Sequence, residues 1–272
     1  MSPRALVVLS TYNQPSLLLA LRGYLRQSVQ DFEVVVADDG SAPPFVEALR
    51  AFLDGPVRRA GLQVRHAWHE DRGFRKTRIV NEALRMAPGP RLVIFTDGDC
   101  VPPARFVERH LLAHAPRSFH VGGCVRWSQE VSAALRPEHV DDGSFEGWRE
   151  PWHARDARWR ALKSRWGVLL RRSRRPKVLG LNMAVDRDLL EEVNGMDERF
   201  EGWGLEDDDL RDRLMAARPR PRVRVLYGRN DVYHLWHPVS VKSVGSPNLA
   251  FYRSPRPSRC VFGLVQEPRL PG

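Results

Sequence analysis

The chain has 272 residues, of which 42% are hydrophobic and 28% are charged, and its formal net charge is +10. This composition suits one large folded domain or two small ones, and it excludes a disordered chain. Nearly all of the excess positive charge is arginine, which favours anionic partners or reflects a GC-rich genome.

The cysteines and the apolar runs point to an intracellular, soluble protein. Cys100, Cys124 and Cys260 are odd in number and lack CxxC spacing, so they indicate neither a zinc site nor a disulfide framework. The apolar stretch at 5–10 is too short for a signal peptide, and no run approaches the ~20 residues of a spanning helix. We expect a cytoplasmic protein, with peripheral contact at the inner face of the cell membrane left open.

The first half of the sequence alternates short apolar runs with helical spacing. Strands are expected at 5–9, 32–37, 62–68 and 91–96. Helices are expected at 16–28, 44–53 and 76–86. Because each apolar run ends in polar residues and a helix follows, we predict an α/β fold, with a mostly parallel sheet and helices on both faces.

The second half is less regular. Strands are expected within 119–127 and at 222–227, and helices at 186–194 and 206–217. The stretch 141–178 is rich in Trp and Arg without a clean period. The tail from 245 onward shows no period either.

Three polar clusters follow predicted strands: Thr11-Tyr12-Asn13, Asp38-Asp39 and Asp97-Gly98-Asp99. Ligands of parallel sheets bind outside the carboxyl ends of the strands, so these clusters should converge on one site. An acid such as Asp39 can accept hydrogen bonds from a ribose or a base, although turn carboxylates have the same pattern.

The Asp97-Gly98-Asp99 turn has the chemistry of a metal site. Its two carboxylates can face one hard cation, because Gly98 lets the backbone bend without steric penalty. Mg²⁺ or Mn²⁺ held in this way takes one or two carboxylates and completes its shell with substrate phosphates. Surface turns and calcium loops share the pattern, but the buried strand before this turn favours a metal site.

Two further groups could serve the same site. Residues 73–78 precede a helix and either contact a diphosphate or form a solvated basic face. His234 and His237 follow a predicted strand, and either imidazole could be a metal ligand beside Asp99 or simply a packed residue.

Four consecutive acids at 206–209 follow Gly202-Trp203-Gly204. At the start of a helix the macrodipole favours such negative charge, which explains the run without any function. A buried member would instead have a raised pKa and could act as a general base toward a hydroxyl group. Trp203 would offer a sugar ring an apolar platform.

The sequence resembles a known enzyme family. Residues 7–13, 34–41 and 95–99 are similar to family 2 glycosyltransferases of the GT-A fold, with its Rossmann-like nucleotide-binding sheet. Residues 202–210 resemble the carboxy-terminal motif of β-1,4-galactosyltransferases, which polypeptide N-acetylgalactosaminyltransferases and chondroitin-type polymerases share. The matches span roughly residues 5–237 in the family's order.

The resemblance implies a donor site for a UDP-sugar in the first half of the chain. Its residues would be Thr11, Tyr12, Asn13, Asp39, Asp71, Arg75, Asn81, Asp97 and Gly98. The resemblance also implies a Mn²⁺ or Mg²⁺ ion bound by Asp99 and by a later histidine, with His237 preferred to His234.

The resemblance implies that Asp207 is the catalytic base and that Glu206 orients the acceptor, with Trp203, Gly204 and Asp208 also at the acceptor. The reaction would be an inverting, metal-dependent transfer of a hexose or N-acetylhexosamine to a glycan or lipid-linked acceptor. Such transfers build bacterial surface polysaccharides and glycolipids. Residues 1–125 would bind the nucleotide sugar, 126–240 would form the acceptor-binding and catalytic half of the same domain, and 241–272 would form a tail.

Three other functions compete with this one. A basic nucleic-acid-binding protein would explain the charge, but it assigns no role to Asp97, Asp99 or Asp207, so we expect no nucleic-acid partner. A nucleotidyltransferase also uses metal-bound acids, but it leaves the cluster from Trp203 onward unexplained. An inactive sugar-binding relative would not need its acids intact.

The stretch from Trp148 to Lys177 matches no motif of the resemblance. It could lie on an anionic membrane surface, bind an acidic glycan, close over the donor as a lid, or form a solvated loop. Our hypothesis is that it contacts a lipid-linked or phosphorylated acceptor.

Overall fold

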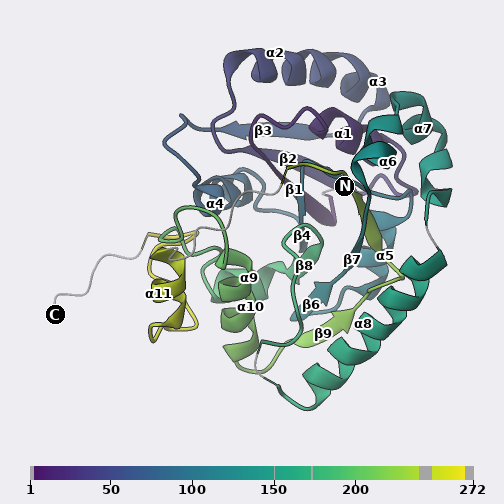
Figure 1. Ribbon diagram of the computed structural model, residues 1–272. Helices are drawn as coiled ribbons and strands as arrows, with labels where there is room; N and C mark the ends of the chain where they lie inside the picture. The colour runs from purple at the N-terminus through teal and green to yellow at the C-terminus, as the bar shows by residue number, and fades with distance from the viewer. Residues whose placement is uncertain (1–2, 150, 173, 239–246, 267–272) are drawn as a thin grey trace.

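The computed structural model describes residues 3–149, 151–172, 174–238 and 247–266. A seven-stranded sheet forms its centre, in the order β3-β2-β1-β4-β8-β6-β9 (Figure 1). Its strands are β1 (Ala5–Thr11), β2 (Phe32–Asp38), β3 (Val64–Trp68), β4 (Leu92–Asp97), β6 (Ser118–Val121), β8 (Met183–Asp186) and β9 (Arg222–Val225). A small second sheet, in the order β5-β10-β7, contains β5 (Cys100–Val101), β7 (Gly123–Arg126) and β10 (Asp231–His234).

The central sheet is mostly parallel. Strands β1 to β4 run parallel to one another, and β6 and β9 are also a parallel pair. Strand β8 is antiparallel to both of its neighbours, β4 and β6. All seven residues of β1 and of β2 are buried, which explains their continuous apolar sequence.

Alternate residues of β1 enter two separate cores. Val7 and Leu9 pack with Leu17 of α1 (Leu17–Leu25) and Leu49 of α2 (Pro43–Phe52). Helix α5 (Phe106–Ala113) contributes to this core as well. The side chains of a strand alternate between the two faces of its sheet, so the neighbours of Val7 and Leu9 serve the opposite core.

The opposite core lies under α4 (Lys76–Met86), α9 (Arg187–Glu192) and α10 (Glu206–Ala216). Val8 of β1 packs there with Ile79 of α4 and Leu214 of α10. Helices therefore cover both faces of the sheet, and the predicted α/β architecture is confirmed (Figure 1).

The remaining elements are short, except for α8. They are a π-helical turn at Leu53–Val57, α3 (Arg58–Ala60), α6 (Gln129–Ala134), α7 (Pro137–Asp142), a 3-10 turn at Ser144–Gly147, α8 (Pro151–Leu169) and α11 (Pro247–Arg253). The predicted strand at 62–68 begins two residues later, and the predicted helix at 186–194 ends two residues earlier. The elements that were not predicted are strands β5 and β8 and helices α3, α5, α6, α7, α8 and α11. In the described part of the chain, no helix is long and apolar enough to cross a membrane.

The strand register brings the polar clusters to one edge. Thr11 pairs with Asp38 at the ends of β1 and β2, and Ser10 pairs with Asp97 at the end of β4. Strand β10 runs antiparallel to β5, with His234 opposite Cys100, which is the residue after Asp99. Strands β8 and β9, from the second half of the chain, join the same sheet as the strands of the first half.

Candidate active site

Asp99, His234 and His237 form a group that can hold a metal ion. One ligand atom from each residue lies within 4.8 Å of the others. Asp99 Oδ2 is 3.3 Å from His237 Nε2 and 3.8 Å from His234 Nε2. One carboxylate with two imidazoles is a suitable donor set for a divalent transition-metal ion. The structure therefore brings both candidate histidines to Asp99.

The electrostatic surroundings of this group favour a cation. Burial and the nearby Asp97 carboxylate raise the pKa of Asp99. Burial lowers the pKa of His234, which favours the neutral ring that metals require. The His237 ring places Nδ1 2.9 Å from the Pro238 carbonyl oxygen. A proton donated there leaves Nε2 free toward Asp99, as in other metal-binding histidines.

Asp97 has a different environment from Asp99. Its Oδ1 accepts a hydrogen bond of 2.6 Å from Ser10 Oγ and one of 2.9 Å from Lys76 Nζ. Burial acts to raise the pKa of Asp97, but the charge of Lys76 and the hydrogen bonds from Ser10 and Lys76 together outweigh burial, so the pKa is lowered. Gly98 allows the close approach of this turn to β1, since an added Cβ would lie 3.1 Å from Thr11 Oγ1.

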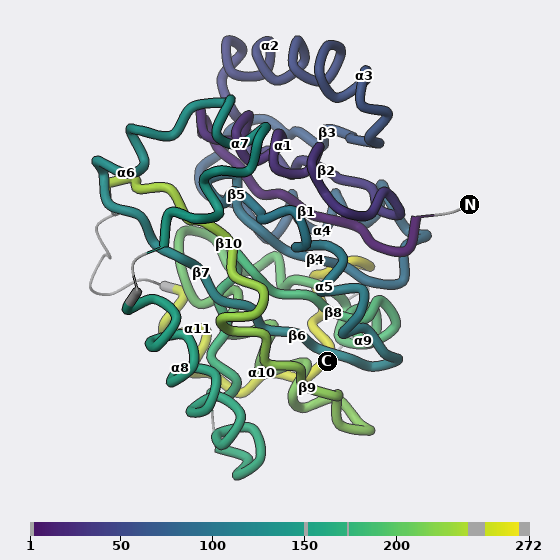
Figure 2. Tube along the Cα trace, turned by 90° about the vertical axis from the view of Figure 1, so that its right-hand side faces the viewer, coloured from purple at the N-terminus to yellow at the C-terminus, as the bar shows by residue number. Residues whose placement is uncertain are grey.

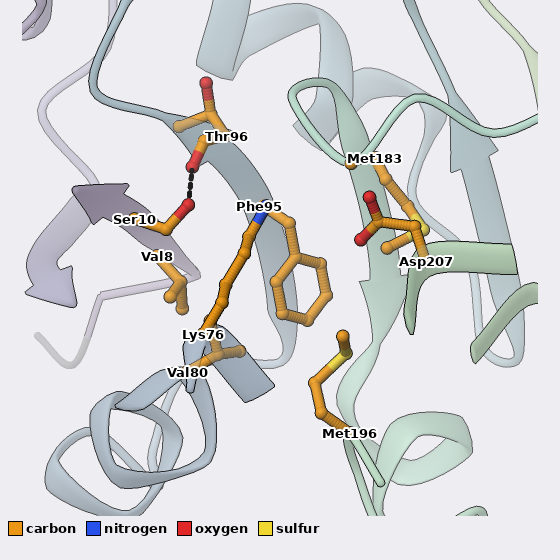
Figure 3. A pocket seen from close by; sticks show the side chains of 10 residues that line it. Val8, Ser10, Lys76, Val80, Phe95, Thr96, Met183, Met196 and Asp207 are labelled. Carbon is orange, nitrogen blue, oxygen red and sulfur yellow. Dashed lines mark hydrogen bonds between the residues drawn. The ribbon is translucent and has the colours of Figure 1, made fainter. Parts of the chain in front are cut away.

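Lys76, the first residue of α4, lies between the Asp97-Gly98-Asp99 turn and the acids of α10. Its ammonium group points into the space between Ser10 and Asp207 (Figure 3). Burial opposes its charge, but Asp97, Asp207 and Glu206 together raise its pKa, so Lys76 is protonated. Sequence reasoning placed residues 73–78 near the site without giving Lys76 a role of its own.

Asp207 and Glu206 lie in the first turn of α10, behind Leu205, whose φ is 77°. Burial raises the pKa of Asp207, and Asp97 raises it further against the opposing charge of Lys76. Burial and the neighbouring Asp207 raise the pKa of Glu206 to about 7. Glu206 Oε2 is buried and has no hydrogen-bond partner among the described residues. Both acids thus have the raised pKa that suits a general base, and Glu206 also has this unpartnered oxygen with which to bind a hydroxyl group.

A closely packed wall lies behind Asp207. An added Cβ on Gly180 would collide with the Asp207 carboxylate, so only glycine permits this approach. A cavity of about 10 Å³ is lined by Asp207 and Lys76 together with Phe95, Met183 and other mostly apolar side chains (Figure 3). The attraction between the two charges is strengthened by this apolar surrounding.

The other two acids of the run face elsewhere. Asp209 is fully buried, and its carboxylate binds Arg213 at 2.7 Å and Arg256 at 2.9 Å. Asp208 is partly exposed and pairs with Arg211. The acidic run therefore contributes two residues to the site, one to the core and one to the surface.

The glycine loop before α10 is open on its outer side. Trp203 is 51% exposed, and an added Cβ at Gly204 would meet no atom within 4 Å. The exposed ring and the unobstructed backbone could accommodate a sugar. The acceptor-binding roles of Trp203, Gly204 and Asp208 stay predictions.

Tyr12, Asp39, Asp71 and Arg75 gather where β1, β2 and β3 end. Asp39 accepts a 2.8 Å hydrogen bond from the Arg75 amide and lies 2.7 Å from His69 Nε2. Burial raises the pKa of Asp39, although both of these neighbours oppose the increase. Tyr12 Oη donates to Asp71 Oδ2 at 2.9 Å. Sequence reasoning missed His69, although its position directly after a predicted strand was a usable signal.

Thr11, Asn13 and Asn81 differ in what their side chains do. Thr11 Oγ1 is buried at the same edge, without a hydrogen-bond partner among the described residues. Asn13 Oδ1 accepts a bond from the Ala42 amide at 2.8 Å and braces its loop. Asn81 lies inside α4, where its amide exchanges hydrogen bonds of 2.8 and 3.0 Å with the Met196 backbone. In the structure, Asn81 therefore links α4 to the backbone at Met196. Its donor-binding role stays a prediction.

The family model described as glycosyl transferase family 2 matches residues 6–175, which is more than half of the chain. The chain belongs to glycosyl transferase family 2. A second family model, described as the N-terminal domain of galactosyltransferase, matches residues 166–238 and so includes α10 and both histidines. The resemblance of the two segments is therefore confirmed, as is the class of enzyme.

Known proteins resemble the chain along most of its length. Validoxylamine A glucosyltransferase of Streptomyces hygroscopicus subsp. jinggangensis (strain 5008) is 28% identical, over 98% of this chain and 67% of the relative. The mannosyltransferase PcManGT from Pyrobaculum calidifontis has a TM-score of 0.54 and 20% identity, over 93% of this chain and 61% of that one. GalNAc-T7 has a TM-score of 0.58 and 14% identity, over 91% and 47%. These likenesses confirm the GT-A fold, and the chain spans about two thirds or less of each protein.

Proposed function

We propose that the chain is a metal-dependent, inverting glycosyltransferase. It would move a hexose or N-acetylhexosamine from a nucleotide sugar to a hydroxyl group of a glycan or lipid-linked acceptor. The observation that carries this proposal is the convergence of the Asp99, His234 and His237 group with the buried acid Asp207 at one edge of the sheet. Lys76 connects the two, because it binds Asp97 and attracts Asp207.

The metal would be Mn²⁺ or Mg²⁺. The two solved structures are described as complexes with GDP-Man and Mn²⁺, and with UDP, GalNAc and Mn²⁺. The donor set of Asp99 and the two histidines supports the same kind of cation here. When bound, a divalent cation stabilises the negative charge of the departing nucleoside diphosphate.

The donor would bind along the ends of β1, β2 and β4. The Asp39 carboxylate and the buried Thr11 hydroxyl supply hydrogen-bonding groups for a base or ribose. The half-exposed ring of Tyr12 supplies an apolar surface beside them. The preference for uridine comes from the resemblance, whereas the name of the curated relative supports a glucosyl donor.

Asp207 would accept the proton of the attacking acceptor hydroxyl. Its raised pKa improves it as a base, and the charge of Lys76 limits that increase so that the carboxylate remains available. Glu206 Oε2 would bind the acceptor, and Trp203 would pack against its ring. A base on the opposite side of the sugar from the leaving group gives inversion at the anomeric carbon.

The test is release of nucleoside diphosphate from UDP-glucose, UDP-galactose, their N-acetylated forms and GDP-mannose, with Mn²⁺ and glycan acceptors. Asp99→Ala and Asp207→Asn should each reduce turnover by about 100-fold to 10,000-fold, since each removes a group used in the transition state. Asp188→Asn, a change of the same kind at an exposed ion pair with Arg91, should leave turnover unchanged. Full activity of either site variant, or pyrophosphate release from a nucleoside triphosphate, would contradict the proposal.

A further inference from the structure

Helix α8 carries a row of large apolar side chains on its solvent side. Trp152, Trp159 and Trp166 are 53%, 65% and 53% exposed. They are seven residues apart, and because an α-helix turns by about 100° per residue, they lie on one face at intervals of about 10 Å. Leu162 and Leu169 are also exposed and follow the same seven-residue spacing. We call these five residues the outer stripe of α8.

The protein side of α8 is made of small residues. Ala161 and Ser164 are buried, and Ala161 belongs to the main core. Ala157 packs so closely on Gly228 that an added Cβ at Gly228 would lie 3.1 Å from Ala157 Cβ. The helix is thus held to the body by its small face, while its large apolar face points outward. This is the reverse of an ordinary surface helix, whose apolar face is turned to the core.

The surroundings of the outer stripe are strongly basic. Between residues 151 and 177 the sequence has ten Lys and Arg residues and one acid, Asp156. Exposed arginines at 155, 158 and 165 lie within or beside the stripe, and 171 and 172 follow the helix. A separate groove of about 570 Å³ lies beyond Gly228, on the protein side of α8, and is lined by Arg109, Arg149 and Arg229 together with Glu146. α8 runs along the outer edge of the molecule in both views (Figures 1 and 2).

We propose that α8 is an interfacial helix that binds the chain to an anionic lipid bilayer. The outer stripe enters the boundary between headgroups and acyl chains, where Trp rings are favoured, and the flanking arginines reach the lipid phosphates. A second copy of the chain is a poorer occupant, since pairing two such helices would bring two basic surfaces together. A nucleic acid would match the charge and the Trp rings, but it offers the leucines no apolar environment.

This surface adjoins the candidate active site along the chain. The segment after α8 leads to Gly180, whose backbone packs on the Asp207 carboxylate. The inference does not depend on the proposed reaction, and its test uses no glycosyl transfer.

The test is flotation of the full chain with phosphatidylcholine vesicles that contain or lack phosphatidylglycerol, at low and at high salt. We expect binding to the anionic vesicles, loss of binding at high salt, and little binding to the neutral ones. Trp159→Ser with Trp166→Ser should weaken binding by more than about tenfold, because two apolar rings no longer enter the bilayer. Arg155→Glu with Arg158→Glu should weaken it by more than about tenfold through charge.

Two matched controls keep the test specific to α8. Leu112→Ser removes an apolar side chain that is 74% exposed on α5, and Arg58→Glu with Arg59→Glu reverses two exposed charges on α3. Both controls should bind vesicles like the parent protein. The proposal is overturned if the parent does not bind anionic vesicles at low salt, or if the α8 variants bind as well as the controls. It is also overturned if sedimentation shows a dimer that only the Trp variant dissociates.

Discussion

The turn after β4 and the first turn of α10 are both acidic, and each divides its acids in the same way. In the turn, Asp97 is neutralised by Lys76 and has a lowered pKa, while Asp99 faces two histidines and has a raised one. In α10, Asp209 is neutralised by two arginines, while the pKa of Asp207 is raised by burial. The partner of an acid, and not its place in an acidic cluster, therefore determines whether the acid stabilises the fold or is available for chemistry.

The largest effect on stability should come from Asp209, the acid of α10 that is neutralised by two arginines. Asp209→Ala leaves the buried Arg213 without its carboxylate partner and removes the bond to Arg256. We expect a loss of about 3–5 kcal/mol in the free energy of unfolding, as for other broken buried ion pairs. Urea denaturation measures this loss. Asp208→Ala is the matched control, because Arg211 retains Asp212 and the loss should be about 1 kcal/mol or less.

The division in α10 breaks down if these two variants are equally stable. In that case the buried pairs of Asp209 would contribute no more than a partly exposed pair, and burial would not distinguish the two acids. Asp207→Asn should affect the free energy of unfolding in the opposite way to Asp209→Ala, or hardly at all. Removing a buried negative charge that is only partly compensated should leave the protein about as stable as before, or more stable.

The pH dependence of kcat/KM should show how the charge of Lys76, which binds Asp97 in the turn after β4, acts on Asp207 in α10. Asp207 must be ionised to act as a base, so kcat/KM should rise as the pH rises through its pKa. Because burial raises that pKa, the rise should lie above the usual range of an aspartate. Lys76→Met removes a positive charge that opposes the increase, so the rise should move to higher pH by about one unit or more.

A full pH profile of kcat/KM distinguishes this role from a purely structural one. Lys76→Arg keeps a positive charge, so its pH profile should lie closer to that of the parent protein than the profile of Lys76→Met does. The return should be partial, because the forked guanidinium group does not fit the space of the ammonium group. A uniform loss of activity at every pH in Lys76→Met, without a shift of the profile, would contradict the electrostatic connection between Lys76 and Asp207.

The smallest effects should come from the histidines beside Asp99. His237→Ala and His234→Ala should each raise the Mn²⁺ concentration needed for half-maximal activity, by about tenfold to 100-fold. His237 should have the larger effect, since its Nε2 lies closer to Asp99 Oδ2, at 3.3 Å against 3.8 Å. Titration of activity with Mn²⁺ measures both. An unchanged Mn²⁺ requirement in both variants would remove the histidines from the metal site.

The sequence alone determined the alternating α/β pattern, the polar edge of the sheet and the two acidic clusters. Strands β1, β2 and β4 are buried on both faces, so they appear as continuous apolar runs that end at polar residues. The acids at 97, 99, 206 and 207 could be named because their order and spacing resemble those of a known family. Each of these features depends on residues that are close together in the sequence, so it can be recognised without the structure.

The use of each acid depends on tertiary contacts that the sequence does not reveal. Lys76 lies more than a hundred residues before Asp207, and nothing in its own segment indicates that it would be buried between Asp97 and Asp207. Strand β8 is too short to be recognised by its pattern, and it is stabilised by its two neighbours in the sheet. Helix α8 was missed although its Trp residues recur every seven positions, because arginines are interspersed among them; only the structure shows that the small residues face the core and the large apolar ones face outward. Burial and charge pairing depend on residues that are distant in sequence, so they follow from the packing of the whole chain.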